Sequence, residues 1–227
     1  MKRFVLVCIA VLSASFNLFA DPEKAVADAT KKLSEAGGYS WSTAREGSPF
    51  FQGEVKGKVR KDGASLVTNP GREGSTYQTA FSGGKAAAQT QNGWQSADEL
   101  EDAEGFGRFL AFGLRSFKTP AAEVDHVVKF ATSLEGEGET YSSELSEDGV
   151  KELLSFGGGG GPEVSGPKGS IKIAVKDGQL AGYELSLSGS MSFNGNDFDL
   201  DRTSKVTISA VGASEFEFPK AAQAKLQ

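Results

Sequence analysis

The feature that most restricts the fold of this chain is a long alternating pattern centred on Asn194-Gly195. Residues 183–206 alternate apolar and polar side chains on both sides of that dipeptide. Asn-Gly is the preferred pair for a two-residue type I′ turn, which joins neighbouring antiparallel strands. Because a shift of one residue would exchange the two faces of the hairpin, a single register keeps the apolar residues on one face. That register pairs Met191 with Phe198, Gly189 with Leu200 and Tyr183 with Val206, with Leu185 and Leu187 on the same face.

The opposite face of this hairpin carries Asp197, Asp199 and Asp201, and the predicted register places each aspartate opposite a serine. A calcium loop of the EF-hand type needs a glycine at its sixth position and a later glutamate. Here the glycine precedes the aspartates and no glutamate follows at the required place. Carboxylates two residues apart on a strand are roughly 6–7 Å apart. We therefore expect the aspartates to be solvent-exposed, and no metal site is predicted.

Further turn dipeptides divide much of the chain into short strands, a pattern typical of an antiparallel meander. Across Asp62-Gly63, Val59 is expected to face Leu66. In the middle of the chain, strands are predicted at 126–133 and 139–145. The turn dipeptides are Asp62-Gly63, Gly83-Gly84, Asn92-Gly93 and Asp177-Gly178.

Other segments have helical rather than strand periodicity. The first, 22–36, begins with Asp21 as N-cap followed by proline. The most apolar spans 100–117, and its apolar stripe either fills a core or covers an apolar cavity as a lid; the filled core is the simpler interpretation. A short helix is capped by Ser146 and ends before the glycine-rich stretch 156–169, which is predicted to be a flexible surface loop.

Residues 1–20 are predicted to be a cleaved secretory signal peptide, and residues 21–227 a single folded domain. Lys2 and Arg3 precede an apolar run, which is the order of a signal peptide. A membrane anchor is the alternative, but the run is short and interrupted by serines and an asparagine. Cys8 lies inside the run, so the mature chain would contain no cysteine. Disulfides and thiol catalysis are then excluded, and no stable transmembrane anchor is expected.

The composition and motifs favour binding over catalysis. Removing residues 1–20 would change the net charge from −6 to −8, which disfavours nucleic acid as a partner. The one histidine, His126, stands beside Asp125, but no Gly-x-Ser-x-Gly motif accompanies it. The glycine run has Pro167 where a phosphate-binding loop requires lysine. We therefore predict a protein that is not an enzyme, without catalytic residues, metal or cofactor.

The order of these segments resembles the LolA/LppX-like superfamily of bacterial envelope proteins, which includes lipoprotein carriers and lipid-binding lipoproteins. The resemblance is carried by the opening helix "PEKAVADATKKLSEAGGYSW", the stretch "FSGGKAAAQTQNGWQSADEL" and the final "SKVTISAVGASEFEFP". The hairpin around "SFNGND" is similar to that of secreted bacterial proteins of the same kind. The resemblance covers nearly all of the mature chain.

This resemblance implies an α+β fold, a curved antiparallel half-barrel wrapped around helices with an apolar cavity between them. It implies a periplasmic or secreted binding protein that carries or senses a lipid or acylated ligand. A non-catalytic structural protein that interacts with another envelope protein is the alternative. The residues expected to line the cavity are Trp41, Phe51, Val55, Tyr77, Phe81, Phe106, Phe109, Leu110, Leu185, Leu187 and Met191.

Overall fold

A computed structural model describes residues 21–47, 53–154, 164–193 and 196–227. The predicted signal peptide, Phe51, the run of five glycines and the Asn194-Gly195 turn lie outside the described residues. Among the described helices, none is long and apolar enough to cross a membrane.

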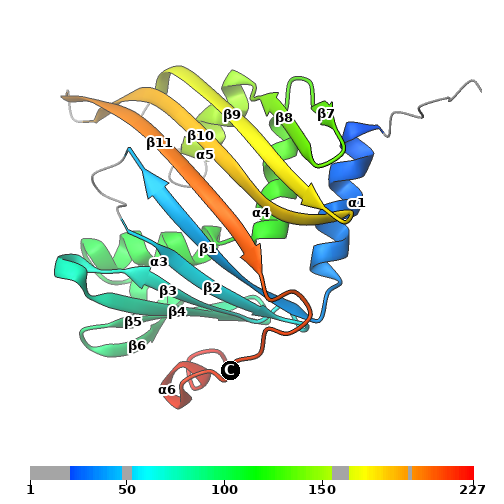
Figure 1. The fold of residues 1–227 in the computed structure, drawn as a ribbon. Helices are drawn as coiled ribbons and strands as arrows, with labels where there is room; N and C mark the ends of the chain where they lie inside the picture. The colour runs from blue at the N-terminus through cyan, green and yellow to red at the C-terminus, as the bar shows by residue number, and fades with distance from the viewer. Residues whose placement is uncertain (1–20, 48–52, 155–163, 194–195) are drawn as a thin grey trace, which may run out of the picture.

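Within the described part of the chain, eleven strands form one antiparallel sheet in the order β6-β5-β4-β3-β2-β1-β11-β10-β9-β8-β7 (Figure 1). Each pair of neighbouring strands in the sheet is also consecutive in sequence, except that β1 pairs with β11, and the consecutive strands β6 and β7 form its two edges. The predicted antiparallel α+β architecture is confirmed. The strands of the first meander are β1 (Gly38–Glu46), β2 (Val55–Arg60), β3 (Ser65–Pro70), β4 (Thr76–Ser82), β5 (Lys85–Thr90) and β6 (Gly93–Ser96). Those of the second are β7 (Glu135–Glu137), β8 (Thr140–Glu144), β9 (Val164–Lys176), β10 (Gln179–Phe193) and β11 (Asn196–Ser209).

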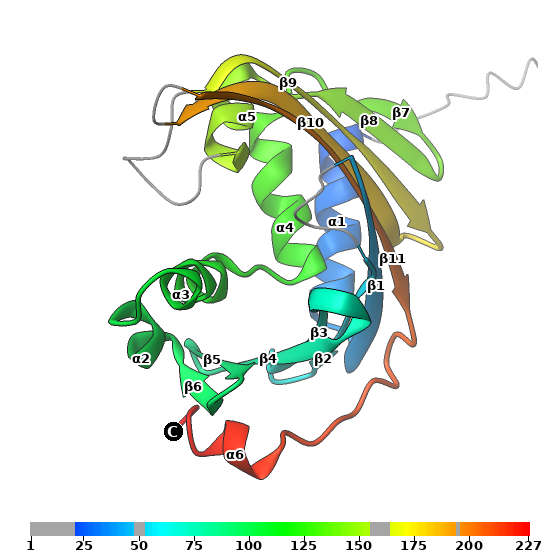
Figure 2. The ribbon, with the colours of Figure 1, turned by 90° about the vertical axis from the view of Figure 1, so that its left-hand side faces the viewer.

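The sheet curls so that its concave face encloses most of the helices (Figure 2). One helical group packs on the half formed by β9 to β11, and the second group packs on β5 and β6. The first group is α1 (Pro22–Ser34), α4 (Pro120–Val127) and α5 (Glu147–Leu154), and the second is α2 (Ala97–Glu101) and α3 (Phe106–Ser116). Two short 3₁₀ turns are η1 (Arg72–Gly74) and η2 (Val128–Phe130).

The C-terminal segment crosses the outer, convex side of the first meander and ends in α6 (Lys220–Gln223) (Figure 2). Phe218 and Ala222 are buried against Ala64 and Ala80, which belong to the outer face. Arg60 lies over the rings of Phe216 and Phe218, 5.2 and 5.4 Å from their centroids. The outer face of these strands is therefore also covered, unlike the outer face of the β9–β11 half.

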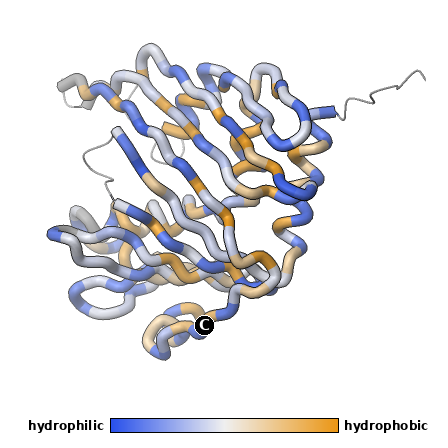
Figure 3. The backbone as a smooth tube through the Cα atoms, viewed as in Figure 1, coloured by the Kyte–Doolittle hydropathy of each residue, from blue (hydrophilic) through white to orange (hydrophobic). Residues whose placement is uncertain are grey.

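The register predicted for the long hairpin is confirmed. Met191 pairs with Phe198, Gly189 with Leu200 and Tyr183 with Val206. Tyr183, Leu185, Leu187 and Met191 are all buried, whereas Asp199 and Asp201 are exposed. Figure 3 shows this alternation along β9 to β11, where apolar residues are separated by polar ones.

The predicted pairing of Val59 with Leu66 is wrong, because the connection between β2 and β3 is one residue longer than expected. The Arg60 amide donates to the Ala64 carbonyl at 2.9 Å, which leaves three residues in the loop. Gly63 adopts a φ of 80°, which suits the left-handed position of a three-residue hairpin loop. Val59 therefore pairs with Ser65, and Leu66 moves to the outer face beside Lys58. The Asn92-Gly93 turn also lies one residue earlier than predicted, since Thr90 pairs with Gly93.

The helix predicted over 100–117 is two helices. The first, α2, has a capping box in which the Ser96 side chain and the Glu99 side chain each accept from the other's backbone amide. The chain then breaks before α3, where Gly105 adopts a φ of 61°. Arg115 pairs with Asp98 and Glu101 and so fastens α3 to α2.

The strand predicted over 126–133 is also wrong, because that region belongs to α4 and η2. Thr119-Pro120 supplies the same start signal as Asp21-Pro22, and Ala121, Val124 and Val127 are buried at a spacing of three residues. The strand predicted over 139–145 is confirmed as β8. The helix predicted to begin at Ser146 is confirmed as α5. The Ser146 hydroxyl accepts a hydrogen bond from the Gly149 amide.

The prediction of a loop over 156–169 is wrong for residues 164–169, because β9 begins at Val164. Pro167 is accommodated by a bulge, at which the register shifts between the Ser188–Lys168 and Ser190–Ser165 pairs.

An aromatic row crosses the inside of the first meander and defines its curvature. Phe117, in the link between α3 and α4, stacks on Phe81 at 3.9 Å between ring centroids and on Trp41 at 6.3 Å. The indole of Trp41 also covers Gly57 on the neighbouring strand. A Cβ atom at position 57 would lie 2.1 Å from Cζ2 of Trp41. Glycine at this position is therefore required by the close approach of the indole.

We expect Gly57→Ala to lower the free energy of unfolding by about 1–3 kcal/mol, because the indole has to move out of the aromatic row. Gly113→Ala is the matched control, since a Cβ atom at that helical position meets nothing within 4 Å. It should be neutral or stabilise by about 1 kcal/mol. Urea denaturation of both variants measures the difference, and equal stability of the two would contradict the role given to Gly57.

Candidate functional site

Charged side chains gather on the concave face among residues that are mostly apolar or aromatic. Arg45 on β1 and Arg202 on β11 are half-buried and project to the same face as Thr43 and Val206. Arg45 pairs with Ser204, so Arg202 is its diagonal neighbour, about 7–8 Å away between Cα atoms. On β10, Leu187 pairs with Arg202. The two guanidinium groups therefore originate side by side on the apolar face of the sheet.

The first turns of α4 place an acid beside these arginines. Burial raises the pKa of Tyr39 on β1, and Thr119 and the backbone of Ala121 at the start of α4 oppose that shift. Glu123, one turn further on, accepts a hydrogen bond from the phenol of Tyr183, which is fully buried in β10. We refer to Arg45, Arg202, Glu123 and Tyr183 as the arginine cluster.

The electrostatics of the cluster follow from burial. Burial lowers the pKa of Arg45, and the Glu123 carboxylate opposes that shift. Burial and the neighbouring Arg45 lower the pKa of Arg202, again opposed by Glu123. Guanidinium groups stay charged in proteins, so both arginines are cations at neutral pH. Burial and the Glu123 carboxylate raise the pKa of Tyr183 well above its usual value, so the phenol is a neutral donor.

The curvature of the sheet brings a residue of β4 toward this cluster. Tyr77 acts electrostatically on Arg45, although β3 and β2 separate their strands. In a flat sheet three strand spacings would span about 14 Å. Burial raises the pKa of Tyr77 and Arg45 lowers it. The curved sheet therefore brings Tyr77 within electrostatic range of Arg45.

The residues predicted to line a cavity have different environments. Trp41, Val55, Leu110, Leu185, Leu187 and Met191 are buried in packed clusters. Tyr77 and Phe81 are half-buried, and 43% of the surface of Phe109 is exposed. Phe117 brings Trp41 and Phe81 into one stacked row. Phe51 and the side chain of Phe106 lie outside the described residues.

None of the four residues of the arginine cluster was among the predicted site residues. A signal for Arg202 was present, because the predicted hairpin register puts this charged residue opposite Leu187 on the apolar face. For Glu123 there was no such signal, since its segment precedes a stretch that was predicted to be a strand.

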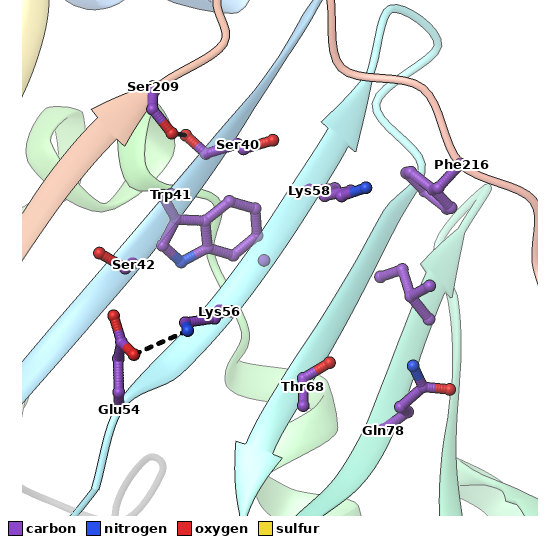
Figure 4. Close-up of a pocket in the computed structure, with 12 residues that line it drawn as sticks. Ser40, Trp41, Ser42, Glu54, Lys56, Lys58, Thr68, Gln78, Ser209 and Phe216 are labelled. Atoms are coloured by element: carbon purple, nitrogen blue, oxygen red, sulfur yellow. Dashed lines mark hydrogen bonds and ion pairs between the residues drawn. The ribbon is translucent and has the colours of Figure 1, made fainter.

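A shallow groove of about 460 Å³ lies on the outer face, and of the residues predicted to line a cavity only Trp41 is among the described residues that line this groove (Figure 4). Lys56 in its wall pairs with Glu54 at 2.9 Å. Phe216 of the C-terminal segment closes one side of the groove. Its other walls are mostly hydroxyl, amide and lysine side chains, namely Ser40, Ser42, Lys58, Thr68, Gln78 and Ser209.

Asp125 and His126 have separate partners. Asp125 accepts from the Thr30 hydroxyl at 2.5 Å and so ties α4 to α1. His126 lies 3.5 Å from Glu152 of α5 and makes an edge contact with Phe130. Among the described residues, no three acidic, histidine or cysteine side chains gather as metal ligands would.

Comparison with known proteins gives similarity at the level of structure. No protein-family model matches the chain, and no curated protein matches it. LprF from Mycobacterium bovis is similar in structure, with 12% identity, a TM-score of 0.47, and coverage of 88% of this chain and 97% of that one. A LolA superfamily protein from Nitrosomonas europaea has 9% identity and a TM-score of 0.38, with 91% and 97% covered. At these values the ligand has to be inferred from the residues of the chain itself.

We expect the stability of the protein to fall above about pH 10 in a way that depends on Tyr183. The unfolded chain releases the phenolic proton near that pH, while the folded protein retains it because the pKa of Tyr183 is raised. Each retained proton lowers the free energy of unfolding by about 1.4 kcal/mol per pH unit above that point.

Tyr183→Phe removes this dependence. The variant should be about 1–3 kcal/mol less stable than the wild type at pH 7, because the Glu123 carboxylate loses its donor. The difference between the two proteins should narrow as the pH rises above 10. Urea midpoints measured between pH 7 and 11 give both values, and parallel curves would contradict the position of Tyr183 in the cluster.

Proposed function

We propose that this chain is a non-catalytic binding protein for an acyl-type apolar ligand, acting in an extracytoplasmic compartment. The main observation in support of this proposal is that the concave face holds two separate apolar clusters. One forms around α1, α4 and β9 to β11, and the other around α2, α3 and β5. Phe81 packs against both clusters, so it marks their boundary.

Incomplete coverage of an aromatic side chain on α3 supports the proposal. The residues of α3 that pack toward β5 are Leu110, Ala111 and Leu114. Phe109 lies outside that packed face and exposes 43% of its surface. An acyl chain laid along the boundary would gain about 0.8 kcal/mol for each methylene group it buries.

A structural role in the envelope is the second candidate. It is favoured by the dense packing of Leu185, Leu187 and Met191, which lie in the core rather than beside open space. In that case the sheet is a rigid platform, and the protein is expected to copurify with another protein and not with lipid.

Uptake of N-phenyl-1-naphthylamine, a neutral apolar fluorophore, distinguishes the two candidates. The wild type should bind the probe, and acyl lipids should appear in native mass spectra of protein prepared from a lipid-containing host. Phe109→Ser should weaken probe binding about fivefold, as expected for loss of part of one aromatic contact. Val211→Ser is the control, because Val211 is also exposed but lies in the C-terminal segment after β11.

Absence of both probe uptake and bound lipid would contradict the carrier proposal and favour the structural role. Equal effects of Phe109→Ser and Val211→Ser would contradict the placement of the ligand along α3.

A further inference from the structure

We infer that the ligand carries an anionic head group, a carboxylate or phosphate, and that Arg45 and Arg202 recognise it. This rests on the proposed function, because it specifies the head of the same acyl ligand.

The strand register places the two guanidinium groups close enough to bind the same anion. Arg45 and Arg202 are diagonal neighbours on antiparallel strands and project from the same concave face. Glu123, which accepts a hydrogen bond from Tyr183 on β10, acts electrostatically on both arginines. Guanidinium presents its N–H donors in a planar fork that matches the paired oxygens of a carboxylate or phosphate.

The charges of the cluster leave room for an anion. Among the described residues, Glu123 is the carboxylate that acts on both arginines, and it also accepts from Tyr183. Arg202 forms no hydrogen bond or ion pair with any residue that the structure describes. A half-buried cation is costly without a compensating charge. A singly charged anion between the arginines would balance the two cations together with Glu123.

The surface beside the cluster suits the apolar part of such a ligand. Leu187 pairs with Arg202, and Leu185 with Ser204 next to it. Along β1 the same face continues from Arg45 through Thr43 to Trp41, where the aromatic row begins. An amphiphile with its head at the arginines would therefore have its chain directed toward Phe117 and Phe81.

The test compares laurate with 1-dodecanol, which have chains of the same length and differ in the charge of the head. Displacement of N-phenyl-1-naphthylamine gives the affinity for each. The wild type should bind laurate about tenfold more tightly than dodecanol, as expected for one charge-assisted contact. Arg202→Gln should abolish that preference by weakening the binding of laurate. Arg202→Lys should keep part of it, because the charge remains without the fork.

Arg108→Gln is the matched control, since Arg108 is exposed on α3. It should preserve the preference for laurate. Circular dichroism checks the fold of each variant, and if Arg202→Gln does not fold, Arg202→Lys and the wild-type preference decide the matter.

The outcomes separate the two proposals. If neither laurate nor dodecanol displaces the probe, the proposed carrier function fails. If both displace it equally from the wild type, the carrier function stands and the anionic head group is wrong. Acetate and inorganic phosphate are added alone as a further arm. Protection of the fold by these small anions at concentrations similar to that of laurate would show a free-anion site and overturn the assignment to a lipid head.

Discussion

The structure depends on the pairing of β1 with β11. Trp41 pairs with Ile208 and Arg45 with Ser204, so strands from opposite ends of the chain lie side by side. Every other neighbour in the sheet is also the next strand in sequence. Without this pair the chain would form two separate meanders, each with a concave apolar face too small to enclose helices. Closure of such a long loop costs conformational entropy, which has to be offset by burial of the shared face.

The curvature that follows from this pairing is maintained from the inside. Trp41 covers Gly57, and Phe117 stacks between Trp41 and Phe81. The aromatic row therefore joins β1 to β4 across the inner face of the first meander. The same curvature allows Tyr77 to interact with Arg45. The arginine cluster thus takes residues from both meanders and from the α4 segment between them, so it exists only in the fully assembled sheet.

The parts of the fold that were predictable are those set by local chemistry. A two-residue turn flanked by regular alternation determined the β10–β11 register, and Asp21-Pro22 determined the start of α1. The β2–β3 pairing was wrong because Asp62-Gly63 also suits a three-residue loop, which the sequence does not distinguish from a two-residue turn. The strand prediction over 126–133 was wrong because its first residues belong to α4, whose buried face packs against α1. The arginine cluster was beyond prediction, since it requires the β1–β11 register and the position of α4 together.

Arg202 is the position that stability alone does not explain. It lies between Leu200 and Ser204 on the face of β11 that packs inward, opposite Leu187. An apolar side chain at this place would extend the core, and replacing buried ions with apolar residues is often neutral or stabilising. The arginine instead adds a cation beside Arg45, and the two repel one another. Glu123 offsets part of that repulsion while Tyr183 fixes the orientation of its carboxylate. The chain therefore has two cations where its two meanders meet on the inner face, and this polar site replaces apolar packing. The positive charge of the site favours binding of a negatively charged group.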